Sequence, residues 1–435
     1  MATAKRYTVL AAGTGINLAL GVLYTWSIFK DSIREAISAG KPGSFAWDPA
    51  TLNDPYAVAC LVFAFMMIAA GRAQDKFGAR VTAYAGGVLV SLGFLLIAHS
   101  VDYWIWIIGF GGLVGSGIAF GYASATPAAL RWFPPAQSGL VTGVVVSGFG
   151  LASAYIAPLA SYLVKHYGLL NTMLFFGIAF FIVVSLLSLL LVAPPPAGKP
   201  DPAALRAAGK AAVARDIPPV DETPRTLLRK RQFWHLWTLY LVGAGAGLMV
   251  IGSISGMAKL SMGEQAFLAV VILAVGNAAG RILAGFLSDK FGRRRILAAV
   301  FLFQAVLMFA AVQASQSGST FLIVLVATLI GFNYGANLAL FPSFAKALWG
   351  MPHFGANYGL LFTSWGVGGF VMSRLSETLK ASSGGYAQPF MVAGLLLLGG
   401  FVLALGFREQ PTDGRSLLGG LFTGHLRHAQ KQGGV

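Results

Sequence analysis

The chain has 435 residues, of which 56% are hydrophobic and only 11% are charged, whereas soluble domains carry roughly 25% charged residues. A water-soluble fold of this composition would expose large apolar patches, so the composition excludes an ordinary soluble protein and predicts a lipid environment. The 55 glycines agree with this prediction, because close helix packing in a bilayer favours small residues. A single cysteine excludes a disulfide framework and a cysteine-rich metal cluster.

Apolar stretches follow one another along the chain, each long enough to cross a hydrocarbon core of roughly 30 Å. They lie near 8–30, 54–73, 81–100, 103–130, 137–164, 169–193, 233–258, 265–288, 294–314, 320–348, 354–379 and 386–408. We therefore predict an all-α integral membrane protein with twelve transmembrane helices in two six-helix halves, at 1–193 and 233–408. The intervening 194–232 is rich in proline and basic residues, which predicts a solvated cytoplasmic linker. Residues 409–435 are expected to form a cytoplasmic tail.

The formal charge of +16 is unevenly distributed. About 23 of the 31 Lys and Arg residues fall at the termini and in the loops after even-numbered helices, and about seven fall on the other side. This asymmetry predicts that both termini of a multi-pass protein are cytoplasmic. The short termini lead us to expect a prokaryotic inner (cell) membrane. The asymmetry also argues against nucleic acid as a partner, because nucleic-acid binding needs a soluble basic face.

A short pattern occurs twice, once after the second apolar stretch and once after the eighth. Five of the first eight positions are identical at an offset of 214, namely Gly71, Asp75, Lys76, Phe77 and Gly78 in the first copy and Gly285, Asp289, Lys290, Phe291 and Gly292 in the second. The repeat indicates a duplicated six-helix unit. Two such halves, rocking about a site near the midplane, are what alternating access requires.

The repeated pattern G-x-x-x-D-K-F-G-x-R resembles the signature loop of the major facilitator superfamily, and the resemblance covers essentially the whole chain. It implies a cytoplasmic gate in which Asp75 and Asp289, with Gly71 and Gly285, engage a neighbouring helix end and basic residues such as Arg131. A carboxylate is favoured at a helix N-terminus. These residues are expected to gate the pathway rather than bind substrate.

Within that superfamily, five short stretches resemble the oxalate/formate antiporter family and the related monocarboxylate transporters. They begin at Gly21, Tyr122, Asn277, Asn333 and Asn357. The resemblance implies a cavity lined by aromatic residues and a substrate-binding arginine, which correspond here to Tyr24, Trp26, Tyr122, Tyr334 and Arg281. Aromatic residues in membrane helices also serve as packing or interface anchors, so both interpretations stay open for each of them.

Arg281 is the one Lys or Arg that our assignment places inside a span and away from its ends. A buried guanidinium is costly in a bilayer, so an intramembrane arginine predicts a functional site. No Asp or Glu lies mid-span to neutralise it, and Asn277, one turn earlier, can orient the guanidinium without cancelling its charge. A substrate carboxylate, which fits the planar fork of donors, would supply the missing counter-ion. The alternative is that Arg281 snorkels to the cytoplasmic surface.

Trp365 stands where the oxalate/formate antiporter is implied to have a lysine that holds the second carboxylate of oxalate. An indole in place of the ammonium leaves the second charge of a dianion unpaired in a low dielectric. We therefore expect a lactate- or pyruvate-like monocarboxylate as substrate, with an oxalate/formate-type carboxylate antiporter as the alternative.

The coupling mechanism stays open. Related monocarboxylate transporters use an acidic residue where this chain has Asn277, so Glu377 is the remaining candidate for proton coupling, with Arg374 as a possible partner. Because a guanidinium does not deprotonate, Arg281 favours anion exchange, while the family resemblance favours proton symport. The expected partners are the carboxylate, a proton or counter-anion, and the bilayer. The protein is expected to be a monomer.

Other classes of protein fit less well. Multidrug exporters commonly carry intramembrane acidic residues, which this chain lacks, and a sensor would be expected to carry a sizeable soluble domain. A membrane-embedded enzyme needs a nucleophile–base pair or a metal cluster, and no such spacing of His, Cys and carboxylates occurs. We therefore expect no catalytic residues, no metal and no cofactor.

Overall fold

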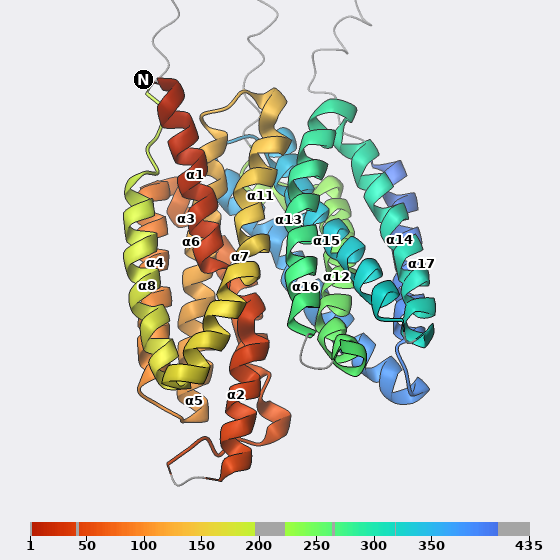
Figure 1. Ribbon diagram of the computed structural model, residues 1–435. Coiled ribbons are helices and arrows are strands. Elements are labelled where there is room, and N and C mark those ends of the chain that lie inside the picture. Colours follow the sequence, from red (N-terminus) through yellow and green to blue (C-terminus); the bar gives the residue numbers. More distant parts are fainter. Residues whose placement is uncertain (1, 41–42, 196–221, 263–265, 318, 408–435) are drawn as a thin grey trace, which may run out of the picture.

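The computed structural model describes residues 2–40, 43–195, 222–262, 266–317 and 319–407, and every regular element in these ranges is helical (Figure 1). The first part of the chain contains α1 (Ala2–Leu20), η1 (Gly21–Thr25), α2 (Trp26–Ala39), η2 (Pro49–Thr51), α3 (Asp54–Phe77), α4 (Ala79–Ala98), α5 (Tyr103–Trp106), η3 (Ile107–Val114), α6 (Gly115–Leu130), η4 (Pro135–Gln137), α7 (Ser138–Tyr167) and α8 (Leu169–Leu189). The second part contains α11 (Pro224–Leu227), α12 (Arg231–Met262), α13 (Ala266–Phe291), α14 (Arg293–Ser317), α15 (Thr320–Trp349), α16 (Phe354–Ser383) and α17 (Ala387–Gly406).

Eleven helical segments in the described ranges are long and apolar enough to cross a membrane. They coincide with eleven of the twelve predicted spans. The twelfth, α16, has 30 residues and packs against α3, α12 and α17, but glycines and polar residues lower its hydropathy. Large apolar side chains face outward, including Phe321 at 75% and Val402 at 66% exposure. This outward apolar surface is the one that lipid can cover.

The first span is longer than predicted and is interrupted. It runs to Ala39 rather than to residue 30, and the 3-10 segment η1 separates α1 from α2. The interruption lies where α7 comes close, since a Cβ added at Gly21 would lie 2.7 Å from the carbonyl oxygen of Phe149. The chain stays helical beyond residue 30 although charged residues occur there, because one face of α2 is buried through Phe29 and Ile33. Gly40, in the left-handed conformation at φ 60°, ends it.

The repeated sequence pattern forms the same turn twice. Gly78 separates α3 from α4 at φ 83°, and Gly292 separates α13 from α14 at φ 91°. These backbone angles favour glycine. In each turn the glycine N–H donates to a carbonyl four residues earlier, that of Gln74 at 2.9 Å and that of Ser288 at 3.0 Å. Each glycine thus ends one helix and starts the next without a loop.

The helices pack in two groups. α1, α3, α4, α6, α7 and α8 contact one another, as do α12, α13, α14, α15, α16 and α17. Figure 1 shows the first group mostly on the left and the second mostly on the right. Two extensive helix pairs, α3 with α16 and α7 with α13, join the groups. Residues 196–221 of the predicted linker and the whole predicted tail, 409–435, lie outside the described residues.

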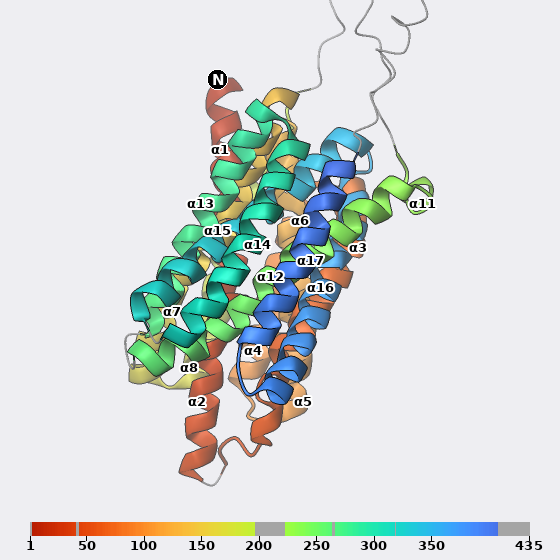
Figure 2. The same ribbon diagram turned by 90° about the vertical axis from the view of Figure 1, so that its right-hand side faces the viewer.

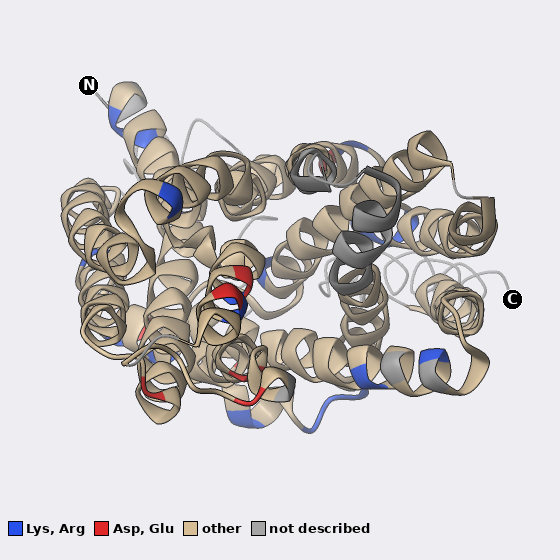
Figure 3. Ribbon diagram, turned by 60° about the horizontal axis from the view of Figure 1, so that its bottom comes forward, with Lys and Arg blue, Asp and Glu red and all other residues tan. Residues whose placement is uncertain are grey.

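The two ends of the bundle differ. We call the end that carries α11 and the turns at Gly78 and Gly292 the linker face, and the end that carries α5 and the C-terminus of α2 the opposite face. Figure 2 shows α11 near the upper end, and α2 and α5 at the lower end. Lys, Arg, Asp and Glu are sparse along the helices, so most of the ribbon in Figure 3 is tan. The few charges inside the bundle therefore stand out as candidates for function.

Candidate functional site

Arg281 of α13 is fully buried in the interface between α13 and α7. Its Nε donates a hydrogen bond of 3.0 Å to Asn277 Oδ1, and one terminal nitrogen donates to the carbonyl oxygen of Val146. The other terminal nitrogen, Nη2, has no hydrogen-bond partner among the described residues. The described part of the chain also places no carboxylate within ion-pair distance. The guanidinium is therefore an enclosed cation with an unused donor, and it does not snorkel to the surface in this conformation.

Glycines allow the helices to enclose this arginine. A Cβ at Gly143 of α7 would overlap the carbonyl oxygen of Arg281, and one at Gly150 would lie 3.1 Å from its Nε. On the other side, a Cβ at Gly335 of α15 would lie 2.7 Å from Asn277 Oδ1. The helical turn from Asn277 to Arg281 is thus held between α7 and α15. Small residues permit such close backbone approach in membrane bundles.

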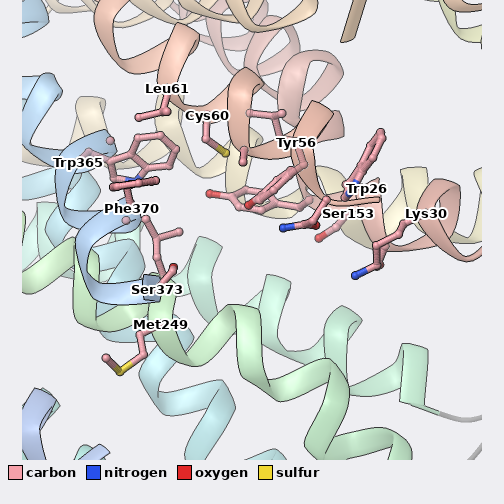
Figure 4. A pocket seen from close by; sticks show the side chains of 18 of the residues that line it. Trp26, Lys30, Tyr56, Cys60, Leu61, Ser153, Met249, Trp365, Phe370 and Ser373 are labelled. Atoms are coloured by element: carbon pink, nitrogen blue, oxygen red, sulfur yellow. The ribbon is translucent and has the colours of Figure 1, made fainter. Parts of the chain in front are cut away.

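A cavity of about 590 Å³ lies on the opposite-face side of Arg281, within the size range of ligand pockets. Figure 4 shows side chains of α2, α3, α12 and α16 around it. Its lining includes Tyr24, Trp26, Asn277 and Trp365 of the predicted site, together with Lys30, Asn53, Asp54, Tyr56, Cys60, Gly150, Ser153, Met249, Phe370, Ser373 and Arg374. Asn53 and Arg374 are exposed, so the cavity reaches the opposite face.

Three of the predicted aromatic residues meet through their polar atoms. The Tyr24 and Tyr334 hydroxyls are 3.2 Å apart, and Trp365 Nε1 donates to the Tyr334 hydroxyl at 2.9 Å. The connection runs from η1 in the first helix group to α15 and α16 in the second. Tyr24 also lies within electrostatic range of Arg281. The predicted residues from both groups are therefore assembled next to the buried cation.

The other two predicted aromatics are placed differently. Trp26 lines the cavity but is mainly packed, with its ring 4.6 Å from that of Phe110. Tyr122 is only 2% exposed and does not line the cavity. Its ring packs behind the cavity wall, with its centre 5.6 Å from the ring centres of both Phe63 and Phe362. Tyr122 therefore does not contact the cavity in this conformation, although its sequence position suggested that it would.

The repeated aspartates each accept two backbone hydrogen bonds at a helix N-terminus. Asp289 accepts from the N–H groups of Gly139 and Leu140 of α7, both at 2.8 Å. Asp75 accepts in the same way from residues 355 and 356 of α16, at 3.1 and 2.9 Å. Such carboxylates satisfy orphan donors and interact favourably with the helix dipole. The two contacts lie at equivalent places on the linker face, and each joins one helix group to the other.

The glycines beside these aspartates lie in backbone contact across the same interfaces. A Cβ at Gly71 would overlap the carbonyl oxygen of Gly355, and a Cβ at Gly285 would overlap that of Gly139. Arg131, an exposed residue after α6, lies within electrostatic range of Asp75. The linker face is thus closed by two matched contacts, whereas the cavity reaches the opposite face.

Other residues of the site were not identified from the sequence. Lys30 lines the cavity, although it lies near a predicted helix end. Phe63 and Phe362, with rings 5.0 Å apart, lie behind the cavity wall and pack against Trp365, which lines it. Phe362 precedes Trp365 by three residues, so helical spacing could have placed both on one face. The side chain of Glu377, the candidate for proton coupling, lies outside the described residues. The described residues contain no group of three or more His, Cys, Asp or Glu side chains that could hold a metal.

Comparisons with known proteins agree with this architecture. The family model described as Major Facilitator Superfamily matches residues 8–373 and, in a second match, 259–430. The chain is 28% identical over 368 residues to the uncharacterized MFS-type transporter YhjX of Escherichia coli, covering 83% of this chain and 85% of that protein. It is 25% identical to the oxalate:formate antiporter of Oxalobacter formigenes (88% and 87% covered) and 28% identical to monocarboxylate transporter 13 of Bos taurus (75% and 73% covered). Among solved structures, the proton:xylose symporter XylE superposes with a TM-score of 0.72 at 11% identity, covering 96% of this chain and all of the other.

Proposed function

Because the chain belongs to the Major Facilitator Superfamily, we propose that it transports small organic monocarboxylates, of the size of lactate or pyruvate, by alternating access. The observation that carries the proposal is the Arg281 guanidinium, which is fully buried and retains an unpartnered Nη2 next to the cavity. A buried unpaired cation is costly. A substrate carboxylate would compensate the charge and would match the planar geometry of the guanidinium.

Asn277 and Tyr24 guide the carboxylate to the arginine in this proposal. Both line the cavity, while Arg281 lies directly behind Asn277, to which it is hydrogen-bonded. An entering carboxylate meets the Asn277 amide and the Tyr24 hydroxyl first. Exchange of the Asn277 contact for a carboxylate contact would then bring the substrate onto the guanidinium. Tyr334 and Trp365 stay hydrogen-bonded to each other and form the adjoining wall.

Trp365 favours a monoanion over a dianion. Its indole lines the cavity and its only polar atom already donates to the Tyr334 hydroxyl. A second carboxylate against the indole would be desolvated with no cation at that wall, because the cations that line the cavity, Lys30 and Arg374, belong to α2 and to a later turn of α16. The small apolar body of a monocarboxylate instead packs against the indole ring. The relative named as a monocarboxylate transporter fits this class of substrate, whereas the name of the oxalate:formate antiporter includes one monocarboxylate, formate, and one dianion.

Asp75 and Asp289 serve as the gate in this proposal. Their hydrogen bonds to the N-termini of α16 and α7 hold the linker face closed, and breaking both would let the two helix groups separate there. The many basic residues at this face, such as Arg80, Arg131 and Arg295, support a cytoplasmic location for it. We therefore place both termini in the cytoplasm. The bacterial origin of two relatives supports a prokaryotic inner membrane as the location, and we propose that the protein is a monomer there.

Proton symport is our first proposal for the coupling, and anion exchange is the second. Among the described residues, Asp54 is the acidic side chain that lines the cavity, and it accepts a hydrogen bond of 2.8 Å from the Tyr103 hydroxyl. Exchange is favoured by a different observation. Arg281 cannot release its charge and has no carboxylate partner in the described chain, so a return step without a bound anion carries an uncompensated cation.

Uptake of labelled L-lactate into proteoliposomes tests the proposal. It is measured with and without an inward proton gradient, with oxalate as competitor and protein-free liposomes as control. Lactate uptake that the gradient stimulates and that oxalate barely inhibits supports a monocarboxylate symporter. Uptake only into vesicles preloaded with a carboxylate, and blocked by oxalate, identifies an antiporter instead. No carboxylate uptake under either condition refutes the proposal.

A further inference from the structure

Three tyrosine hydroxyls lie buried between Trp365 of the cavity wall and the linker face. They belong to Tyr122 of α6, Tyr240 of α12 and Tyr358 of α16, whose side chains are 2%, 0% and 3% exposed. The Tyr358 hydroxyl lies near enough to those of Tyr122 and Tyr240 for hydrogen-bonding contact, but none of the three makes a hydrogen bond of good geometry in the described chain. Buried polar groups in proteins are normally well satisfied, so three poorly satisfied hydroxyls in one place require an explanation.

Phe362 separates these hydroxyls from the cavity. Its ring stacks on that of Trp365, which lines the cavity, at 5.1 Å. The rings of Tyr122, Tyr240 and Tyr358 lie 5.6, 6.2 and 5.7 Å from the same phenylalanine. Helical rise places Trp365 about 17 Å, and the three tyrosines about 6 to 14 Å, from the helix ends at the linker face. All three tyrosines are thus nearer the linker face than Trp365, and Phe362 itself, at about 12 Å, lies at the level of Tyr122 and Tyr240.

Unpartnered polar atoms continue above and below this cluster. The backbone of Arg281 lies about 15 Å from the linker-face end of α13, and Gln74 and Thr142 lie about 5 and 6 Å from their helix ends. Both polar atoms of the Gln74 side chain and the Thr142 hydroxyl lack partners in the described chain. These residues come from both helix groups. Poorly satisfied polar groups thus occur at several depths between the buried cation and the linker face.

We propose that the hydroxyls of Tyr122, Tyr240 and Tyr358 form a second carboxylate-binding site, which the substrate occupies after it leaves Arg281 and the linker face opens. The inference rests on the proposed function, because it places a second substrate site on the same transport pathway, between Arg281 and the linker face. Hydroxyl donors suit a carboxylate in transit, because they bind the anion without the permanent charge that would trap it. In the closed conformation the site is collapsed around Phe362, and the hydroxyls face one another instead of an anion.

Lactate transport measured from each face tests this site. The double variant Tyr240→Phe/Tyr358→Phe removes two hydroxyls and keeps the rings, and Tyr84→Phe, at a 46% exposed position of α4, is the matched control. Initial rates are measured in inside-out and right-side-out membrane vesicles. We expect KM at the linker face to rise at least about tenfold, since each hydrogen bond to a charged group contributes about that factor or more. A substitution cannot alter the transport equilibrium, so Vmax/KM must fall by the same factor in both directions. At the opposite face KM should therefore change less than twofold, and the loss should appear in the maximal rate.

The outcomes separate this inference from the proposed function. A double variant that transports like the wild type from both faces overturns the second site and leaves the hydroxyls a role in binding structural water only. An equal rise of KM at both faces also overturns it, because that result indicates a general disturbance of packing. If the double variant does not fold, the single variants Tyr240→Phe and Tyr358→Phe are judged by the same comparison. Arg281→Lys, measured in parallel, tests the proposed function alone.

Discussion

Replacing Arg281 by lysine is the most direct test of the carboxylate site. The substitution keeps the positive charge inside the bundle but removes the planar guanidinium. In the structure, one donor of Arg281 is used by Asn277 Oδ1 and another by the carbonyl oxygen of Val146, and Nη2 remains available. A lysine ammonium that satisfied the same two acceptors would have one donor left and could not bind a carboxylate through two parallel hydrogen bonds.

The expected size of the effect follows from this loss. A hydrogen bond to a charged group contributes about 1.5 to 3 kcal/mol, and about 1.4 kcal/mol corresponds to a factor of ten. Loss of one such bond should therefore reduce Vmax/KM for lactate by a factor of about ten to about one hundred. Protein abundance in the membrane should stay close to that of the wild type, because the buried charge and its two protein contacts are retained.

The assay is initial lactate uptake into proteoliposomes at matched protein content, with the thermal stability of the purified variant measured beside it. Arg34→Lys is the control, because Arg34 is 53% exposed and pairs only with Asp31 on the surface of α2. Near-normal uptake by Arg281→Lys would refute the assigned role of the guanidinium. Loss of uptake together with a large loss of thermal stability would instead point to a structural role for the arginine.

Three further predictions concern the cavity wall, the gate and the linker. Trp365→Lys should strengthen inhibition of lactate uptake by oxalate at least about tenfold, because it supplies a second cation for the dianion; unchanged inhibition would contradict our interpretation of the wall. Gly285→Ala should abolish most transport and lower the free energy of unfolding by about 1–3 kcal/mol, since the added Cβ overlaps the Gly139 carbonyl. Full transport activity would show that this helix contact is not needed. Lys230 lowers the pKa of Glu222 through a hydrogen bond. This surface pair contributes below about 1 kcal/mol to the stability of the fold. The contribution is present at pH values above the ordinary glutamate pKa and is lost as the pH falls through the lowered pKa of Glu222. Melting temperatures between pH 7 and pH 3 should therefore fall slightly more for the wild type than for Glu222→Gln, and equal slopes would count against the pair.

Much of the fold could be predicted from the sequence, because each lipid-facing helix must satisfy its own backbone and present apolar side chains locally. The hydropathy of 20-residue windows therefore located the spans, to within a few residues at most ends. The exception is informative: the first span continues to Ala39 because α2 buries one face against other helices, which local hydropathy does not report. The duplicated loop was visible for the same local reason, since Gly78 and Gly292 need positive φ angles within the turn itself.

The candidate site was only partly predictable. Arg281 was evident because a cation inside an apolar stretch is rare and costly wherever the helix packs. Its partner Asn277 was also evident, because it lies one turn earlier on the same helix, but Val146 was not, since it is 135 residues away and belongs to the other helix group. The position of Tyr122 below Phe362 rather than at the cavity wall depends equally on how the groups meet.

The sequence by itself thus determined the membrane class, the helices, the internal repeat and the buried charge, because these follow from the chemistry of short segments in lipid. Only the tertiary structure decided which face of the bundle is closed and which side chains surround the cavity. Those features depend on contacts between the two helix groups, such as those of Asp75 and Asp289 with distant helix N-termini. A carrier of this kind encodes more than one packing of the same helices, so the pattern along its chain is compatible with each of them, and the arrangement of the groups selects one.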